Sequence, residues 1–243
     1  MACEISIIVP TYNERDNVAP LIHKLRTVLL GINWEVIFVD DDSPDGTSAS
    51  VKQEMTRDTR VRLICRKGKT GLSSACIDGM LAAGSPYLVI MDGDMQHDET
   101  ILPSMLELLR KQGVDLVIAS RYMRGAGVGR WSVDRVAASW LATRLTRLLT
   151  GVDLSDPLSG YFMLKKDVFL SVAPRLRRSG YKILLDIVTL STGSVTFCEI
   201  PYVFRLREFG KSKLSIPVLF DYNFYIFKYF IGRFSRPKTV TSF

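Results

Sequence analysis

Two aspartates spaced one residue apart follow an apolar run in the stretch VIMDGDMQHDE, residues 89–99. In an extended segment, side chains at i and i+2 leave the same side of the backbone, so Asp92 and Asp94 can face the same space. Two adjacent carboxylates repel each other unless a positive charge lies between them, and oxygen ligands suit Mg²⁺ or Mn²⁺. Gln96 could supply a third oxygen. A turn explains this stretch equally well when it is taken alone, because Asp-Gly is common in loops.

A second acidic cluster, Asp40, Asp41 and Asp42, ends another apolar run, WEVIFV. A loop is again the simplest explanation, since DDDSPDGT is rich in turn-forming residues. Three adjacent acids are nevertheless costly without a partner, even on a chain of net charge +7. The hydroxyl and amine donors of a nucleoside would provide that partner.

Two familiar nucleotide-binding motifs are excluded. The segment CRKGKTGLSSA contains Gly68-Lys69-Thr70, but a P-loop needs a glycine five residues before Gly68, where Leu63 stands. No GxGxxG follows a predicted strand either, which argues against a dinucleotide-dependent dehydrogenase.

Apolar runs that predict buried strands alternate with helical patterns through the first 120 residues. Strands are expected at residues 5–10, 34–39, 61–65, 87–91 and 115–120. Because these runs are apolar on both faces, they predict an α/β fold with a mostly parallel sheet flanked by helices. Ligands of such sheets bind outside the carboxyl ends of the strands. Residues 10–14, 40–42 and 92–94 should therefore converge on one rim.

The second half of the chain carries a looser pattern. A basic helix is expected at 133–149, a strand at 159–166, a helix at 181–192 and a strand at 195–207. No repeat or low-complexity linker divides the chain, so we expect one domain over residues 1–215.

The remaining segment, residues 216–243, is rich in aromatic residues. One helical face would carry Phe220, Phe224, Phe227, Ile231 and Phe234. The run is interrupted by charges and is shorter than the roughly 20 apolar residues of a spanning helix. It predicts an amphipathic helix that lies in a membrane interface or, equally well on pattern alone, packs against the domain.

Composition narrows the class of partner. The basic excess favours an anionic partner, which could be nucleic acid, anionic lipid or a phosphorylated substrate. The four cysteines are scattered without a CxxC pair and there are two histidines, which argues against a disulfide framework and a His/Cys metal site. No signal peptide is expected, and a reducing, cytosol-facing compartment fits best.

Several segments together resemble the family-2 inverting glycosyltransferases of the GT-A fold (nucleotide-diphospho-sugar transferases with a Rossmann-like sheet). The segments are SIIVPTYNERDNV, VDDDSPDGT, KTGLSSA, VIMDGDMQHDE, ASRY, DPLSGYFMLKKDVF and GKSKLS. More narrowly, they are similar to the polyprenyl-phosphate glycosyltransferases, which include the dolichol-phosphate mannose synthases. The similarity spans about residues 4–215, with the motifs in the family's order.

The resemblance implies roles for individual residues. The donor site would comprise Pro10, Tyr12, Glu14, Val39, Asp41, Asp42, Asp92, Gly93, Asp94, Arg207 and Lys213. The metal ligands would be Asp92, Asp94 and Gln96. The acceptor phosphate would be bound by Arg121, Arg135 and Ser139, which with Asp92 and Asp94 form the implied catalytic set.

The implied reaction transfers mannose from GDP-mannose to a polyprenyl (dolichyl) monophosphate for glycan and glycoprotein assembly, with Mg²⁺ or Mn²⁺ as cofactor. The acceptor phosphate has a second pKa of about 6, so it is largely dianionic and needs no general base. Relatives often carry transmembrane helices after the catalytic domain. The expected location is therefore the cytoplasmic face of a membrane, with the interfacial segment or a membrane-anchoring partner holding the enzyme there.

Three other functions remain open on the sequence. A polyprenyl-phosphate glucosyltransferase would use UDP-glucose with the same mechanism. A metal-dependent nucleotidyltransferase or nucleic-acid binder would suit the positive charge, but no recognition helix accompanies the basic residues, so no nucleic acid is expected. A non-catalytic sugar-nucleotide or lipid-binding protein would be free to lose the pair Asp92 and Asp94 and the pair Arg207 and Lys213, which are all present.

Overall fold

The computed structural model describes residues 3–68, 71–111, 113–129, 133–151, 153–180, 182–191, 193 and 195–207, without the side chains of 133–135, 137, 138, 149 and 150. Lys213, the side chain of Arg135 and the aromatic segment 216–243 lie outside these residues.

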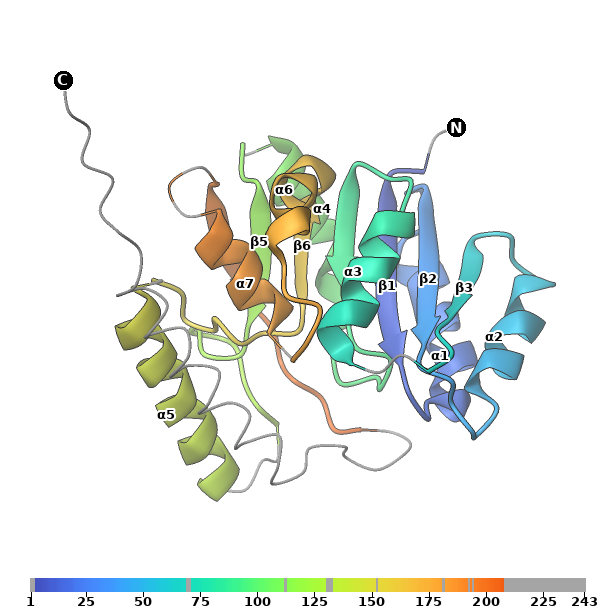
Figure 1. Cartoon of the computed structure of the whole chain (residues 1–243), viewed down its shortest axis with the longest axis horizontal. Helices are drawn as coiled ribbons and strands as arrows, with labels where there is room; N and C mark the ends of the chain where they lie inside the picture. The colour runs from blue at the N-terminus through green and yellow to red at the C-terminus, as the bar shows by residue number, and fades with distance from the viewer. Residues whose placement is uncertain are drawn as a thin grey trace.

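A seven-stranded sheet forms the centre of the described part of the chain (Figure 1). Its strands lie in the order β3-β2-β1-β4-β6-β5-β7. Their bounds are β1 Ile5–Thr11, β2 Trp34–Asp40, β3 Val61–Cys65, β4 Tyr87–Ile90, β5 Leu116–Ser120, β6 Phe162–Lys165 and β7 Phe197–Pro201. All neighbouring pairs are parallel except those that involve β6. The predicted mostly parallel sheet is confirmed.

Strand β6 runs antiparallel between β4 and β5, which the sequence pattern did not predict. Its first residue, Phe162, pairs with Ile90 near the carboxyl end of β4 and with Ile118 of β5. The segment that precedes β6 therefore lies at the rim where the parallel strands end. This reversal brings residues 156–161 to the edge of the sheet that carries the acids.

Helices cover both faces of the sheet. The bounds are α1 Arg15–Val28, α2 Thr47–Met55, α3 Leu72–Ala82, α4 Leu102–Lys111, α5 Val133–Thr150, α6 Lys166–Val172 and α7 Ile183–Leu190, with 3₁₀ turns at Glu99–Ile101 and Ala173–Arg175. One apolar core joins the sheet to α1, α2 and α4, and a second joins it to α3, α6 and α7. Adjacent residues of β1 alternate between them, with Ile7 in the first core and Ile8 in the second.

Helix α3 approaches the sheet closely at Gly79. A Cβ atom at Gly79 would lie 2.4 Å from Cγ2 of Ile8 and 3.0 Å from Cγ2 of Val39. The absence of a side chain lets α3 lie directly on β1 and β2. As a result, the first turn of α3 ends up beside the carboxyl end of β2.

The predicted strand at 195–207 is shorter in the structure and ends at Pro201. The backbone N–H of Tyr202 still donates to the carbonyl of Ser120, the last residue of β5, at 3.1 Å. The chain then leaves the sheet, and the backbone N–H of Arg205 donates to the carbonyl of Gln96 at 2.8 Å. This turn carries Arg205 and Arg207 from the sheet edge to the acidic rim.

Helix α5 stands apart from the two helix layers (Figure 1). In the part of the chain that the structure describes, no helix combines the length and apolarity needed to cross a membrane.

Candidate active site

The carboxyl ends of β1 and β4 bring Glu14 and Asp94 to one arginine. Nη2 of Arg207 donates to Oδ2 of Asp94 at 2.5 Å, and Nη1 donates to Oε1 of Glu14 at 3.4 Å. Gly93 lies close to the end of β1, where a Cβ atom would come within 3.2 Å of Cγ2 of Thr11. The absence of a side chain at Gly93 therefore lets the two strand ends approach each other. The expected convergence of the strand ends on one rim is confirmed, and Glu14, Gly93, Asp94 and Arg207 meet there.

Two hydrogen bonds hold Glu14 in place in addition to its contact with Arg207. Its backbone N–H donates to Oγ1 of Thr47 at 2.9 Å, and Nδ2 of Asn17 donates to its Oε2 at 2.6 Å. Asn13 turns the chain in the left-handed region, with φ of 54°. The turn after β1 thus points a held carboxylate toward the end of β4.

The two aspartates of the DGD stretch differ in environment. The Asp92 side chain is 38% exposed, whereas Asp94 is buried. Burial raises the pKa of Asp94, the charge of Asp92 adds to this, and Arg207 opposes it. A cation between the two carboxylates would relieve the same repulsion.

Gln96, the third expected metal ligand, is held at this turn by two hydrogen bonds. Its backbone N–H donates to Oδ1 of Asp94 at 3.2 Å, and its Nε2 donates to the carbonyl of Arg205 at 3.0 Å. Among the described residues, no group of three His, Cys, Asp or Glu side chains could hold a metal ion. Two carboxylates and an amide oxygen fit a hard cation that takes its other ligands from water or from a substrate phosphate.

His97 has a structural role that the sequence alone does not reveal. The backbone N–H of Asp92 donates to its Nδ1 at 3.0 Å, which places the ring proton on Nε2, 3.7 Å from Oδ2 of Asp92. The ring stacks on Tyr161 at a centroid distance of 4.9 Å, and Tyr202 and Phe204 meet it edge-on. Burial lowers its pKa to about 4. A neutral imidazole therefore supports Asp92 from within an aromatic cluster. In the sequence, the only indication of this role is that His97 stands five residues after Asp92.

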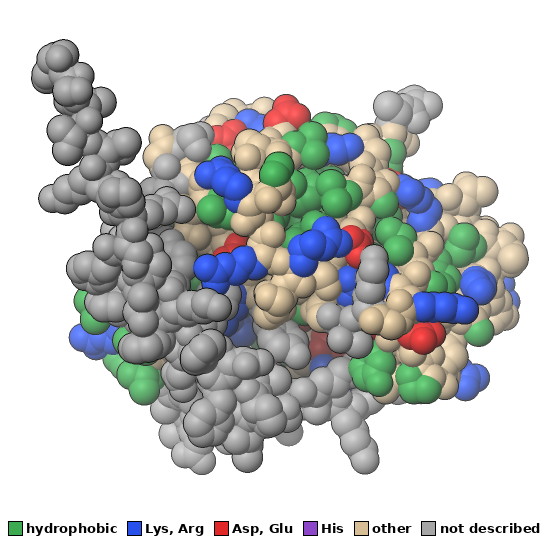
Figure 2. Space-filling model, viewed as in Figure 1, with side chains coloured by type: hydrophobic (Ala, Val, Ile, Leu, Met, Phe, Trp, Pro, Cys, Tyr) green, Lys and Arg blue, Asp and Glu red, His purple; other side chains and the backbone are tan. Residues whose placement is uncertain are grey.

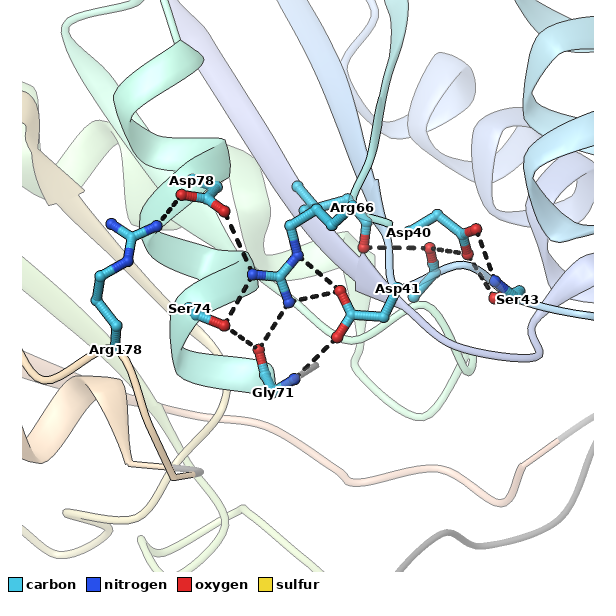
Figure 3. A network of polar contacts seen from close by, with 10 residues as sticks. Asp40, Asp41, Ser43, Arg66, Gly71, Ser74, Asp78 and Arg178 are labelled. Atoms are coloured by element: carbon cyan, nitrogen blue, oxygen red, sulfur yellow. Dashed lines mark hydrogen bonds and ion pairs between the residues drawn. The ribbon is translucent and has the colours of Figure 1, made fainter. Parts of the chain in front are cut away.

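The three acids after β2 have three different environments. Asp40 is fully buried and accepts hydrogen bonds from Thr11, Ser43 and Ser48, so it shapes the loop. Asp41 is held by Arg66 and by the backbone N–H of Gly71 (Figure 3). Asp42 is exposed.

The remaining residues that were expected at the donor site lie at the end of β1 and in the core. Tyr12 is 44% exposed and Pro10 is half-buried, so both can line a surface site. Val39 is fully buried against α3. Only the backbone of Val39 can face the rim.

Arg121 follows β5 and is held by Asp156, a residue of the segment DPLSGYFMLKKDVF to which the sequence alone assigns no role. Nε and Nη2 of Arg121 donate to the two oxygens of Asp156 at 2.7 and 2.9 Å. Burial alone would lower the pKa of Arg121, but the bonds and charge of the fully buried Asp156 raise it. The backbone N–H groups of Ser155 and Asp156 donate in turn to Glu199 of β7.

Ser139 of α5 lies close to the same strand end. Its hydroxyl is 2.5 Å from the hydroxyl of Tyr122, and the guanidinium of Arg121 lies 5.5 Å from the Tyr122 ring centroid. The structure therefore brings Arg121 and Ser139 together through Tyr122.

Helix α5 exposes apolar and basic side chains on its outward side. Trp140, Leu141, Leu145 and Leu148 are exposed, whereas Thr143 and Thr146 are buried. The guanidinium of Arg144 lies 5.3 Å from the Trp140 ring centroid. Hydrophobic and basic side chains gather at the lower left of the space-filling view, where α5 lies (Figure 2).

The chain is similar to proteins of known family. A family described as "Glycosyl transferase family 2" matches residues 6–172. Proteins named dolichol-phosphate mannosyltransferase are similar in sequence. That of Pyrococcus furiosus is 37% identical over 93% of this chain and 63% of its own length, and that of Saccharomyces cerevisiae is 35% identical over 94% of this chain and 90% of its own. The chain thus spans under two thirds of the Pyrococcus protein.

The fold is similar to that of solved glycosyltransferases. A glucosyl-3-phosphoglycerate synthase from Mycobacterium tuberculosis, solved with Mn²⁺, UDP-glucose and glycerol 3-phosphate, aligns with a TM-score of 0.68. The alignment covers 98% of this chain and 82% of that chain at 17% identity. The likeness confirms the expected GT-A fold.

The enclosed imidazole of His97 predicts a pH dependence. Its folded pKa of about 4 lies below the ordinary value of 6.5, so the unfolded chain binds more protons between these values. The free energy of unfolding should fall as the pH drops from about 6.5 toward 4. In NMR spectra at about pH 5.5, the His97 ring of the folded protein should remain neutral, whereas a histidine in an unfolded chain is largely protonated at that pH. A His97 ring that is protonated at about pH 5.5 in the folded protein would contradict this.

Proposed function

The chain belongs to glycosyl transferase family 2, and on this premise we propose that it is an inverting enzyme that transfers mannose from GDP-mannose to a polyprenyl (dolichyl) monophosphate. The observation that carries the proposal is the convergence of Glu14, Asp94 and Arg207 at one rim. It occurs in a chain whose relatives named dolichol-phosphate mannosyltransferase align over 93–94% of its length.

The donor binds at the carboxyl ends of β1, β2 and β4. Asp92, Asp94 and Gln96 would hold Mg²⁺ or Mn²⁺, which would stabilise negative charge on the leaving diphosphate. The Mn²⁺ and UDP-glucose of the solved mycobacterial relative support a divalent ion with a nucleotide sugar. Asp41 faces the nucleoside, with Pro10, Tyr12, the Val39 backbone and Asp42 around it.

Arg207 neutralises Asp94 in the structure. A guanidinium and a divalent cation at the same carboxylate would repel each other. Arg207 therefore exchanges Asp94 for diphosphate oxygens when the donor binds, and Lys213 assists it. The arginine thus compensates the buried carboxylate first and the leaving group later.

The acceptor phosphate binds at Arg121, Arg135 and Ser139. Asp156 fixes the plane of the Arg121 guanidinium through two bonds, which orients its remaining N–H groups. A largely dianionic phosphate is already a nucleophile, so the protein's task is to align it with the anomeric carbon. Direct in-line attack inverts that carbon.

A membrane surface is the partner that fits α5. A polyprenyl phosphate resides in a bilayer, and α5 combines exposed leucines and a tryptophan with Arg144 and Arg147. This composition suits an interface between acyl chains and anionic headgroups. The same helix carries Ser139, so docking would bring the acceptor site to the lipid phosphate at the cytoplasmic face.

Transfer of a labelled sugar tests the reaction itself. Radiolabel should move from GDP-mannose to a short polyprenyl phosphate with Mg²⁺ or Mn²⁺ and not with EDTA. Asp94→Asn should lower the rate at least about 100-fold, because the leaving diphosphate loses its charge stabilisation. Asp98→Asn removes a nearby acid that pairs with Arg205 and should retain most activity.

Each alternative gives a different result in this assay. Transfer from UDP-glucose alone would keep the mechanism and overturn the donor. Donor binding without transfer to any polyprenyl phosphate would favour a non-catalytic binding protein. Full activity of Asp94→Asn would contradict the metal assignment.

The ion pair of Arg207 predicts an effect on metal binding without nucleotide. Arg207→Gln should bind Mn²⁺ roughly 3- to 10-fold more tightly, since it removes a competing positive charge worth about 1 kcal/mol or more beside Asp94. Electron paramagnetic resonance of free Mn²⁺ measures this directly. Arg205→Gln is the matched control, because Arg205 pairs with Asp98 and Glu99. Weaker Mn²⁺ binding by Arg207→Gln would show that Arg207 does not compete.

The exposed face of α5 predicts lipid binding. Leu141→Glu/Leu148→Glu should reduce co-sedimentation with anionic vesicles at least about tenfold, since carboxylates replace apolar area that binding buries. Leu170→Glu, at an exposed leucine of α6, is the control and should sediment like the unaltered protein. Equal losses in both variants would argue against a specific role for α5.

A further inference from the structure

Arg66 is a buried charge at the nucleotide end of the rim. It follows β3 directly, in the segment CRKGKTGLSSA that fails as a P-loop, and its side chain is 2% exposed. Its Nε and Nη2 lie 2.6 and 2.5 Å from Oδ1 of Asp41, and Nη2 also donates to the carbonyl of Gly71 at 3.0 Å. Nη1 donates to Ser74 and Asp78 of α3 at 2.7 and 3.3 Å. All three guanidinium nitrogens are therefore engaged.

The surrounding charges alternate in sign. Figure 3 shows Arg66 between Asp41 and Asp78, with Arg178 on the far side of Asp78. A buried guanidinium is costly unless carboxylates compensate it, and here two do. The loop that carries Arg178 is also tied to α3, because the backbone N–H of Ser73 donates to the carbonyl of Gly180 at 3.2 Å. Asp78 thus supports Arg66 from behind, and Arg178 supports Asp78.

These contacts restrict what Asp41 can bind. An ionised carboxylate has about four acceptor positions. Two on Oδ1 are taken by Arg66, and one on Oδ2 by the backbone N–H of Gly71 at 2.9 Å. The Asp41 side chain is 11% exposed, so about one acceptor position is left toward the rim.

Resting on the proposed function, which assigns Asp41 to the nucleoside, we propose that Arg66 is a positioning residue for nucleobase recognition. Arg66, which Asp78 supports, fixes the Asp41 carboxylate so that one of its oxygens accepts a hydrogen bond from one ring N–H of the base. Guanine and uracil present such a ring N–H, whereas adenine presents an acceptor there. Arg66 and Gly71 then belong to the base end of the donor site, away from the diphosphate.

The guanidinium geometry makes the role testable. Lysine keeps the charge but cannot reproduce the fork that grips Oδ1 and contacts α3 at the same time. Arg66→Lys should therefore loosen Asp41 and weaken nucleoside diphosphate binding by roughly 10- to 100-fold. Inorganic pyrophosphate, which has no base, should bind with unchanged affinity in the presence of Mn²⁺.

Calorimetry of the full chain with Mn²⁺ measures the affinities of the wild-type and variant proteins for GDP, UDP, ADP and pyrophosphate. Asp78→Asn should weaken nucleoside diphosphate binding by roughly 3- to 10-fold and leave pyrophosphate unchanged, because Arg66 keeps Asp41 but loses its charged support. Arg62→Lys is the control. Arg62 lies on β3, the strand that Arg66 follows, and pairs with Glu35 at 2.6 Å, away from Asp41, so nucleoside diphosphate and pyrophosphate should bind as before.

A loss confined to ligands with a base supports the role of Arg66. Equal losses for pyrophosphate and the nucleoside diphosphate, or no loss at all, would overturn it. Wild-type preference for ADP would overturn the ring N–H assignment. If Arg66→Lys does not fold, Asp78→Asn decides by the same comparison.

Ligand binding by the wild-type protein distinguishes a failure of this inference from a failure of the proposed function. Binding of UDP in place of GDP would overturn the GDP donor, and Arg66 would then be judged on UDP. Binding of pyrophosphate with neither GDP nor UDP would overturn both the nucleotide-sugar function and the role of Arg66.

Discussion

Repulsion between carboxylates is the constraint on which the site depends. Parallel strands end at one rim, and three neighbouring strands of this sheet deliver acids there. Three of the buried or partly buried carboxylates are met by an arginine from another segment of the chain: Asp41 by Arg66, Asp94 by Arg207, and Asp156 by Arg121. Because a buried charge is tolerated only when it is compensated, these pairs fix where the connecting segments must run. The fold around the rim is in this sense organised by charge as well as by apolar packing.

The pairs also divide the rim into separate parts. Arg66 serves the end of β2, Arg207 the ends of β1 and β4, and Arg121 the end of β5. The reversed strand β6 separates the last of these from the others, because the segment before it supplies Asp156 beside Arg121. A donor and an acceptor, both anionic, can therefore meet at one edge while each has its own counter-charge.

The sequence predicted most strands and the meeting of their ends because both follow from local patterns. An apolar run of five residues marks a buried strand wherever it lies, and a parallel sheet places carboxyl ends together. The direction of β6 and the pairing of Asp156 with Arg121 have no such local signature. Both features join residues that become neighbours only through the topology of the sheet, so no spacing in the sequence indicates them. The resemblance to a family named Arg207 and Asp94 as functional, but their direct contact was visible only in the structure.

The contact of Arg207 with Glu14 joins residues 193 positions apart. Closing so large a loop has an entropic cost that local contacts do not bear, so such contacts form late in folding. The segment that carries Arg207 follows β7, the edge strand that pairs with β5. Until that edge is in place, Glu14 and Asp94 face each other without this counter-charge. During synthesis the nucleotide-binding half can therefore become compact before its acidic rim is electrically balanced, and the site matures only after the chain has grown past residue 207.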